Sequence, residues 1–289
     1  MTRASTHNTA PLGILAGNGV LPGMVARGAR ALGRPVVVAG LKGEVDLALR
    51  DEVELFREVP IGSLGAVLKT FHDGGAREAV MVGGVSKRRL FSRVRPDRLA
   101  AKLLLRLRHF KDDHALRALA DLLAEHGVQV VDASAFVPDA LAPVGVMTRR
   151  QPSEGEWQDI RFGFDVLRDL APVDVGQTVV VRSGVILAVE AIEGTDACIR
   201  RGAELGKGRS VITRGGAVVC KRVKPHQDRR FDLPAVGPRT VEVCAEVGVQ
   251  VLAVEAGGTL MLDRVALQQQ ADRSRLTLVG VDVGEGGAA

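Results

Sequence analysis

Charge of both signs is concentrated in one short stretch of the sequence, residues 221–232. It contains the cations Lys221, Arg222, Lys224, Arg229 and Arg230, together with His226, Asp228 and Asp232. Cations neutralise a multiply charged anion, and carboxylates bind Mg²⁺ or orient water, so this mixture suits a diphosphate–metal complex. A surface hairpin closed by salt bridges accounts for the same residues at least equally well.

Two glycine-bearing loops, AGNGVLP and GGVSKRRLF, each follow an apolar run and are candidates for phosphate binding. Glycine lets the backbone approach a ligand closely, and the start of a following helix presents free N–H groups to an anion. The candidate residues are Gly17, Asn18, Gly19, Gly84, Ser86 and Lys87. A plain strand-to-helix turn and a solvated basic loop are the alternatives. A nicotinamide cofactor is not expected, because Pro22 replaces the third glycine of GxGxxG and no acidic residue closes the second strand.

Two further clusters combine carboxylates with a predicted helix start. In HFKDDHALR, the side chains of His109, Asp112, Asp113 and His114 are of types that bind metals. The favoured interpretation is a capped helix in which Asp112 or Asp113 accepts first-turn N–H bonds, and one of the two can also face a ligand. In VEAIEGTDACIRR, carboxylates precede a Gly-Thr helix start with Thr195 as the predicted N-cap, a pattern that can bind a cation and an anion side by side. An ordinary capped helix is again the alternative. The candidate ligands in this second cluster are Glu190, Glu193, Gly194, Thr195 and Asp196.

The composition narrows the class of partner. A net charge of +5 and a pI near 9.4 favour anionic ligands. With no Tyr, one Trp and eight Phe, the chain offers few stacking platforms, so nucleic acid is not expected as a partner. Three widely spaced cysteines indicate reduced thiols in a reducing compartment. The N-terminal segment has no apolar stretch of the kind a secretory signal needs, and no run of about 18 apolar residues predicts a membrane span.

The elements that must position these residues alternate along the first half of the chain. Apolar strands at 12–17, 34–41 and 78–85 are separated by helical patterns, which predicts a parallel α/β sheet. In the second half, a hairpin turning at Ser183-Gly184 precedes alternating helices and strands. We therefore expect a disordered tail at 1–11, a domain at 12–141, a linker at 142–155 and a second α/β domain at 156–289.

Several segments together resemble one known family: LGILAGNGVLP, FKDDHALR, DVGQTVVVRSGVILAVEAIEGTDACIRRGAEL, KPHQDRRFDLPAVGP, VEAGGTLMLDR and LTLVGVD. They are similar to the UDP-2,3-diacylglucosamine pyrophosphatases of lipid A synthesis, of the type unrelated to the calcineurin-like phosphoesterases. The resemblance spans about Leu12 to Asp282, and its most specific parts are AVEAIEGTDA and KPHQDRRFDLP.

The resemblance implies a Rossmann-like N-terminal domain, a distinct C-terminal α/β domain, and Mg²⁺-dependent hydrolysis of UDP-2,3-diacylglucosamine to UMP and the diacylglucosamine 1-phosphate called lipid X. Asp232 matches an aspartate that is essential in the family, which implies a catalytic role, and Asp232 with Glu190 are the expected metal ligands. Lys224 and Gln227 match the KPxQ piece. The expected substrate-binding set adds these two residues and Asp113, Gln177 and Arg230 to the candidates above.

A substrate with two acyl chains resides in a membrane, so the protein must reach the membrane surface to bind it. We therefore expect a cytoplasmic protein, peripheral on the inner membrane through basic and exposed apolar residues. The sequence does not decide whether the protein forms a homo-oligomer. The alternatives are another nucleotide-diphosphate-lipid hydrolase and a non-catalytic nucleotide-lipid binding protein.

Overall fold

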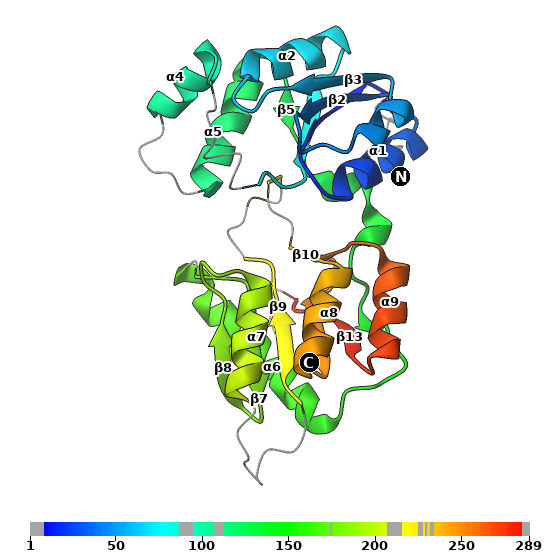
Figure 1. Cartoon of the computed structure of the whole chain (residues 1–289), viewed down its shortest axis with the longest axis vertical. Helices are drawn as coiled ribbons and strands as arrows, with labels where there is room; N and C mark the ends of the chain where they lie inside the picture. Colours follow the sequence, from blue (N-terminus) through cyan, green and yellow to red (C-terminus); the bar gives the residue numbers. More distant parts are fainter. Residues whose placement is uncertain are drawn as a thin grey trace, which may run out of the picture. The chain divides into compact units, whose positions relative to one another are not determined.

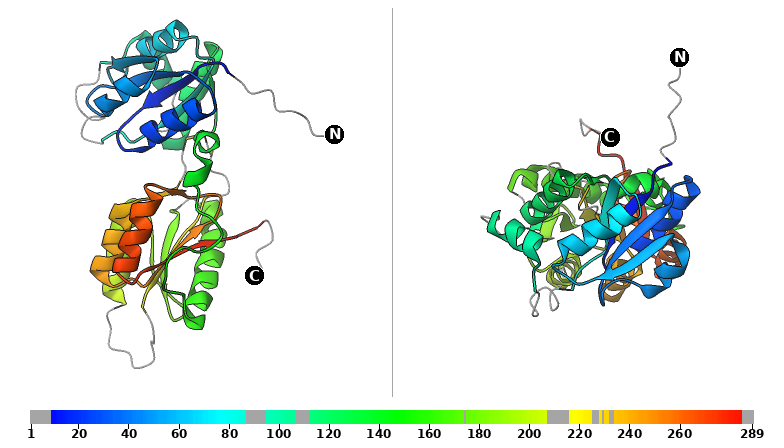
Figure 2. Two further views of the ribbon diagram at one scale, coloured as in Figure 1. Left: turned by 90° about the vertical axis from the view of Figure 1, so that its right-hand side faces the viewer. Right: turned by 90° about the horizontal axis from the view of Figure 1, so that it is seen from above.

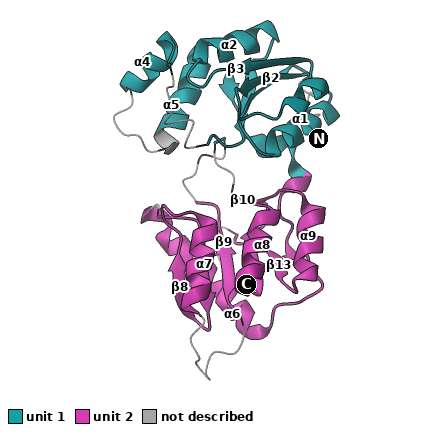
Figure 3. Cartoon of the chain, in the orientation of Figure 1, with its two compact units in different colours: residues 1–138, 228–232 teal, residues 139–227, 233–289 magenta. Residues whose placement is uncertain are grey.

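The chain folds into two compact units, which Figure 3 distinguishes by colour. Unit 1 consists of residues 1–138 and 228–232, and unit 2 of residues 139–227 and 233–289. The structure is a computed structural model, and it describes residues 9–86, 95–106, 112–173, 175–206, 216–224, 228, 230–231 and 234–284. The expected linker, 142–155, belongs to unit 2, whereas the short segment 228–232 belongs to unit 1.

Unit 1 contains a five-stranded parallel sheet in the order β3-β2-β1-β4-β5. Its strands are β1 (Leu12–Ala16), β2 (Val36–Leu41), β3 (Leu55–Val59), β4 (Glu78–Val82) and β5 (Gln129–Val130). β1 and β2 are apolar along almost their whole length because helices cover both faces of the sheet. The predicted parallel α/β fold is therefore confirmed.

The helices of unit 1 connect these strands (Figure 1). They are α1 (Leu21–Ala31), α2 (Leu64–Asp73), α4 (Arg98–Arg106) and α5 (Asp112–Glu125), with the short 3₁₀ turns η1 (Leu47–Glu52) and η2 (Ala133–Phe136). A third 3₁₀ turn, η3 (Pro138–Ala140), spans the boundary at which unit 2 begins. One core joins α2, α4 and α5 to the sheet, with Phe71 and Leu123 fully buried in it. α1 packs against β1 and η2 instead.

Unit 2 contains a six-stranded mixed sheet in the order β6-β13-β11-β9-β7-β8. Its strands are β6 (Gly145–Val146), β7 (Thr178–Arg182), β8 (Val185–Val189), β9 (Val218–Lys221), β11 (Val251–Glu255) and β13 (Thr277–Val281). β9, β11 and β13 run parallel, whereas β7 is antiparallel to both β8 and β9. The predicted hairpin is confirmed: Ser183 and Gly184 join β7 to β8, both with positive φ, as a tight two-residue turn requires.

Helices cover both faces of the unit 2 sheet (Figure 2, left). α6 (Glu154–Leu170) packs on one face through Ile160, Phe164 and Leu167. α7 (Thr195–Leu205), α8 (Pro238–Val247) and α9 (Arg264–Arg273) pack on the other. The 3₁₀ turn η4 (Ala171–Val173) follows α6, and β10 (Ala235–Val236) and β12 (Leu260–Met261) form a separate parallel pair. Within the described part of the chain, no helix is long and apolar enough to cross a membrane.

Candidate functional site

The loops after β1 and β4 of unit 1 lie against each other at one sheet edge. β1 and β4 are neighbours, and the strand order reverses between them, which is where ligands bind in open α/β sheets. Asn18 N donates to Gly84 O at 2.8 Å, and Gly84 N donates to Asn18 O at 3.1 Å. A Cβ on Gly17 would lie 2.3 Å from Gly84 O, so only glycine permits this approach. The structure thus brings Gly17, Asn18, Gly19, Gly84 and Ser86 together.

Glu44, which is not among the candidates predicted from the sequence, fixes the side chains of this loop pair. Asn18 Nδ2 donates to Glu44 Oε2 at 2.7 Å, and Ser86 Oγ donates to Glu44 Oε1 at 2.6 Å. β2 ends at Leu41 without an acidic residue, as expected, and Glu44 lies three residues further on, in the segment that follows the strand. The sequence signal that could have identified Glu44 is its position shortly after a strand that ends at this edge. The arrangement positions the two polar side chains rather than leaving them free to rotate.

In unit 2, polar side chains gather at the carboxyl edge of the parallel strands. β9 ends at Lys221 and β11 at Glu255, while β7 begins and β8 ends at this same edge because Thr178 pairs with Lys221 and Val189 with Val179. Such an edge, with helix N-termini above it, is where α/β sheets bind anionic ligands.

At this edge, a buried lysine, a threonine and a glutamate form a chain of hydrogen bonds. Lys221 Nζ donates to Thr195 Oγ1 at 2.9 Å, and Thr195 Oγ1 donates to Glu190 Oε1 at 2.9 Å. Glu190 is 7% exposed and Lys221 is 3% exposed. The second carboxylate oxygen, Glu190 Oε2, is buried without a hydrogen-bond partner among the described residues. A buried carboxylate oxygen of this kind is a candidate ligand for a cation or a water molecule.

Thr195 is the first residue of α7 rather than its N-cap. Gly194 takes the cap position with φ of 83°, and this conformation releases the Thr195 hydroxyl toward Glu190 and Lys221. The prediction of Thr195 as the N-cap is therefore wrong, because the cap needs a positive φ that glycine adopts without strain. In the sequence Lys221 is one charge among several, and the signal for its burial is its position at the end of an apolar strand.

Gln177 lies directly before β7 at the same edge. Its main-chain oxygen accepts from Arg222 N at 2.9 Å, and its side-chain Oε1 is buried without a hydrogen-bond partner among the described residues. The neighbouring Thr178 Oγ1 is in the same state. Three buried acceptor atoms at this end of the sheet, on Gln177, Thr178 and Glu190, thus have no donor among the residues that the structure describes, as expected where a ligand or water binds.

The two other acidic candidates near α7 form ion pairs. Arg201 contacts Glu193, and its hydrogen bond lowers the pKa of the Glu193 carboxyl below the ordinary 4.5. Ala191 N also donates to Glu193 Oε2, at 3.1 Å. Asp196 lies 3.6 Å from Arg239 Nε on the surface of the first turn of α7. These contacts give Glu193 a role in fixing the loop that leads into α7.

The described part of the opening charged stretch contains a close ion pair. Arg230 Nε and NH2 donate to the two oxygens of Asp228 at 2.9 and 2.7 Å, and the guanidinium lies over the Phe231 ring at 4.8 Å. The hydrogen bond from Arg230 lowers the pKa of the Asp228 carboxyl, and Arg117 of α5 adds a smaller effect. Asp228 and Arg230 therefore satisfy each other. Lys224 lies in unit 2, after β9, and is half-buried.

Several predicted site residues lie outside the described residues. These are Lys87, Gln227 and Asp232, together with the side chain of Asp113, whose backbone belongs to the first turn of α5. Within the described ranges, no three His, Cys, Asp or Glu side chains cluster as a ready-made metal site. Glu190 is the one expected metal ligand within those ranges, and its buried Oε2 suits a hard cation as a single ligand.

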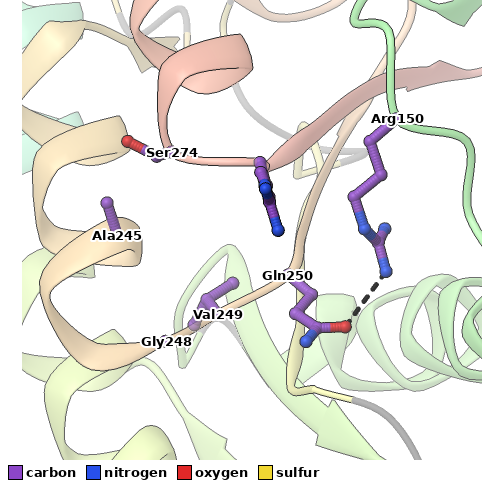
Figure 4. A pocket seen from close by; sticks show the side chains of 7 residues that line it. Arg150, Ala245, Gly248, Val249, Gln250 and Ser274 are labelled. Carbon is purple, nitrogen blue, oxygen red and sulfur yellow. Dashed lines mark hydrogen bonds between the residues drawn. The ribbon is translucent and has the colours of Figure 1, made fainter.

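A depression of about 470 Å³ lies at the opposite, amino edge of the unit 2 sheet (Figure 4). Its lining includes Arg150, Gln250 and Arg275. Arg150 is already bonded to Glu156 at 2.6 Å and to Gln250 at 3.0 Å. The C-terminal ends of α8 and α9 meet here, and their partial negative charge disfavours a diphosphate. The carboxyl edge is therefore the better candidate for phosphate chemistry.

Comparison with known proteins agrees with this two-unit arrangement. The profile of the LpxI N-terminal domain matches residues 11–140, and that of the LpxI C-terminal domain matches residues 143–279. A curated relative from Caulobacter vibrioides, described as UDP-2,3-diacylglucosamine pyrophosphatase LpxI, is 34% identical over 275 residues, which cover 94% of this chain and 97% of that protein. The two profile matches include Glu44, Glu190, Thr195 and Lys221. The chain belongs to the LpxI family.

Proposed function

We propose that this protein hydrolyses the diphosphate of UDP-2,3-diacylglucosamine, giving UMP and 2,3-diacylglucosamine 1-phosphate in lipid A biosynthesis. The observation that carries the proposal is identity of 34% over 94% of the chain to a pyrophosphatase described as acting on that substrate. In the reaction, water attacks one phosphorus, the bond between that same phosphorus and the bridging oxygen breaks, and the bridging oxygen leaves with the other phosphoryl group. The sites described above offer the kinds of groups that this reaction requires.

In unit 1, the loop pair at the reversal of strand order is suited to a nucleotide or phosphoryl group. Gly17 lets the two loops approach each other closely, Gly84 is exposed, and no described side chain caps the N-terminus of α1. The free N–H groups of that helix end therefore attract an anion. Glu44 orients Asn18 and Ser86, so their polar atoms are fixed before a ligand arrives.

In unit 2, the Lys221–Thr195–Glu190 chain supplies a positive charge and an oriented carboxylate. The hydrogen bond from Thr195 uses Glu190 Oε1 and leaves Oε2 for a ligand. Lys221, on the far side of the same hydroxyl, offsets the charge of the buried carboxylate and favours an anionic substrate nearby. We assign these three residues to the positioning of the diphosphate.

We further propose Mg²⁺ as the cofactor, with Glu190 and Asp232 as its protein ligands. Glu190 Oε2 fits this assignment because it is a buried oxygen without a donor among the described residues. Mg²⁺ commonly binds one or two carboxylates and completes its shell with water and substrate phosphates, so a preformed three-residue cluster is not required. When bound, the ion would stabilise the charge that develops on the phosphate oxygens.

Three residues outside the described ranges keep the roles that the sequence assigns to them. Asp232 is proposed as the catalytic carboxylate, which orients the attacking water, and Gln227 and Lys87 as substrate-binding groups. Asp113, Gln177 and Lys224 complete the proposed binding set with Arg230. In the described structure Arg230 contacts Asp228, so binding of phosphate by Arg230 would compete with that ion pair.

We also propose that the protein works in the cytoplasm as a peripheral protein of the inner membrane, because its substrate is a lipid. The charge of +5 suits anionic head groups. Size-exclusion chromatography with light scattering on the purified protein measures whether it forms a homo-oligomer.

The test is incubation of the purified protein with UDP-2,3-diacylglucosamine and Mg²⁺, followed by separation of UMP. Release of UMP together with 2,3-diacylglucosamine 1-phosphate is expected. Binding of the substrate without UMP would favour a nucleotide-lipid binding protein instead. Full activity after exhaustive EDTA treatment would refute the metal proposal while leaving the hydrolase proposal intact.

A further inference from the structure

Helix α4 of unit 1 exposes two adjacent leucines on its outer side. Leu105 is 89% exposed and Leu104 is 46% exposed, while Ala100 and Leu103 on the inner side are buried in the core. α4 packs against α2 and α5, and Figure 1 shows it at the periphery of unit 1. The inner residues therefore account for the packing of this helix, and the outer leucines are not used by the fold.

Basic side chains accompany the outer leucines. Arg98 and Lys102 are exposed and precede Leu105 by seven and three residues, so the three lie along one side of the helix. Arg95, just before the helix, is also exposed. These three cations have no ion-pair partner within the described ranges, and Asp97, the nearby carboxylate, is occupied by Gly65 N and Ala100 N at 2.7 and 2.8 Å.

We propose that this outer face of α4 (Arg95, Arg98, Lys102, Leu104 and Leu105) docks on the surface of an anionic lipid bilayer. Leucines reach the boundary between head groups and acyl chains, while the long stems of Arg and Lys let their charges remain among the phosphates. This proposal rests on the proposed function, because a lipid substrate gives the protein a reason to bind a bilayer. The exposure and charge of the face are observed independently of that function.

The charge around the leucines favours a bilayer over a protein partner. The centre of a protein interface is depleted in charged residues, whereas this face has three cations and only two apolar side chains. Ile192, which at 96% is the most exposed large apolar residue described in unit 2, lacks this pattern because its neighbour is Glu193. A single exposed apolar residue of that kind is ordinary on a protein surface.

The test compares the unmodified chain with Leu105→Glu in co-sedimentation with phosphatidylcholine vesicles, with and without phosphatidylglycerol. We expect binding that requires phosphatidylglycerol and falls with salt, and a loss of about tenfold or more in Leu105→Glu. Arg98→Ala combined with Lys102→Ala should weaken binding by about fivefold per cation. Leu47→Glu is the matched control, because Leu47 is 52% exposed in the same unit and lies beside Asp46.

A second measurement separates this inference from the proposed function. Hydrolysis of UDP-2,3-diacylglucosamine dispersed in detergent micelles should be the same for Leu105→Glu and the unmodified chain, because the bilayer is absent. Vesicle binding that is unchanged in Leu105→Glu, or lost equally in Leu47→Glu, would overturn the inference. A matching fall in micellar kcat/KM would overturn it as well, because it would place Leu105 at the lipid substrate. If neither the unmodified chain nor any variant hydrolyses the substrate, the proposed function is refuted. The vesicle-binding result would still decide whether the outer face of α4 binds a bilayer.

Discussion

Lys221 Nζ lies 2.9 Å from Thr195 Oγ1, so a buried ammonium at the end of β9 is joined to the first residue of α7. The same hydroxyl donates to Glu190 at 2.9 Å. A threonine between two buried charged groups can serve both only because it is at once donor and acceptor. This relationship connects the end of β9, the start of α7 and the segment that follows β8, at the edge where phosphate chemistry is proposed.

Replacement of Thr195 by valine tests this connection. Valine keeps the shape but leaves Glu190 Oε1 and Lys221 without the shared hydroxyl, so we expect a loss of about 1–3 kcal/mol in unfolding free energy. If the three residues position substrate, kcat/KM should fall by about tenfold or more. Denaturant unfolding and UMP release measure the two effects. Thr195→Ser restores the hydroxyl and should recover both, and a Ser variant as impaired as the Val variant would contradict the role of the hydroxyl.

Glu44→Gln tests the loop pair of unit 1. Glutamine keeps the size of the side chain but has only one acceptor oxygen, so it cannot accept from both Asn18 and Ser86 through separate oxygens. We expect KM to rise several-fold with a smaller change in kcat, because the loops are then less well ordered for binding.

The matched control for Glu44→Gln is Glu52→Gln. Glu52 pairs with Arg27 on the surface, with side chains 39% and 60% exposed, an interaction worth about 0–1 kcal/mol. Steady-state kinetics of both variants decide the question. Equal KM values for Glu44→Gln and Glu52→Gln would remove Glu44 from the substrate-positioning groups.

The alternation of short apolar runs with amphipathic helical patterns predicts the two α/β domains, because each strand and helix is specified by neighbouring residues in the sequence. The hairpin was also predictable, since Ser183-Gly184 between apolar runs is a local turn signal. The Glu44 contacts were not, because they join residues 26 and 42 positions away along the chain through side-chain hydrogen bonds. Such contacts depend on the strand order, and a single sequence does not specify that order.

The burial of Lys221 in unit 2 likewise could not be predicted from the sequence alone. A lysine next to Arg222 reads as solvated, yet β9 lies between β7 and β11 in the sheet, so its last residue is enclosed. The sequence also does not predict that segment 228–232 belongs to unit 1, because its charged residues continue those of 221–227, which belong to unit 2. In both places tertiary position outweighed local polarity.

The three cysteines should be inert in the folded protein. Burial raises the pKa of Cys198 and of Cys244 to about 12 and raises that of Cys220 as well, so the reactive thiolate is scarce at neutral pH. Iodoacetamide treatment followed by mass spectrometry should find no modification in native conditions and three modified cysteines after unfolding. Rapid native modification of Cys220, the residue bonded to Ile160 O, would contradict its burial.

Asp228→Asn should lower stability in a pH-dependent way. Arg230 lowers the folded-state pKa of Asp228 below 3.8, so the stabilisation is complete above that unfolded value and is lost as pH falls through the folded value. We expect the variant to lose about 1 kcal/mol near neutral pH, since the pair is partly exposed, and to match the unmodified chain in strong acid. Urea unfolding across pH measures this difference. A constant difference at all pH values would contradict the ionic origin.

Asp232→Asn tests the proposed catalytic carboxylate. An amide of the same size cannot orient water as a base or bind Mg²⁺ as a carboxylate does, so we expect kcat to fall by about 10²-fold or more while substrate binding persists. Asp228→Asn is the matched control, because it removes a carboxylate from the same segment that is occupied by Arg230. Melting curves accompany the kinetics. A catalytic role is supported if Asp232→Asn loses turnover at an unchanged melting temperature and Asp228→Asn keeps its turnover. Near-native turnover of Asp232→Asn would refute the catalytic role and leave Asp232 as a charge that pairs with the cations of its segment.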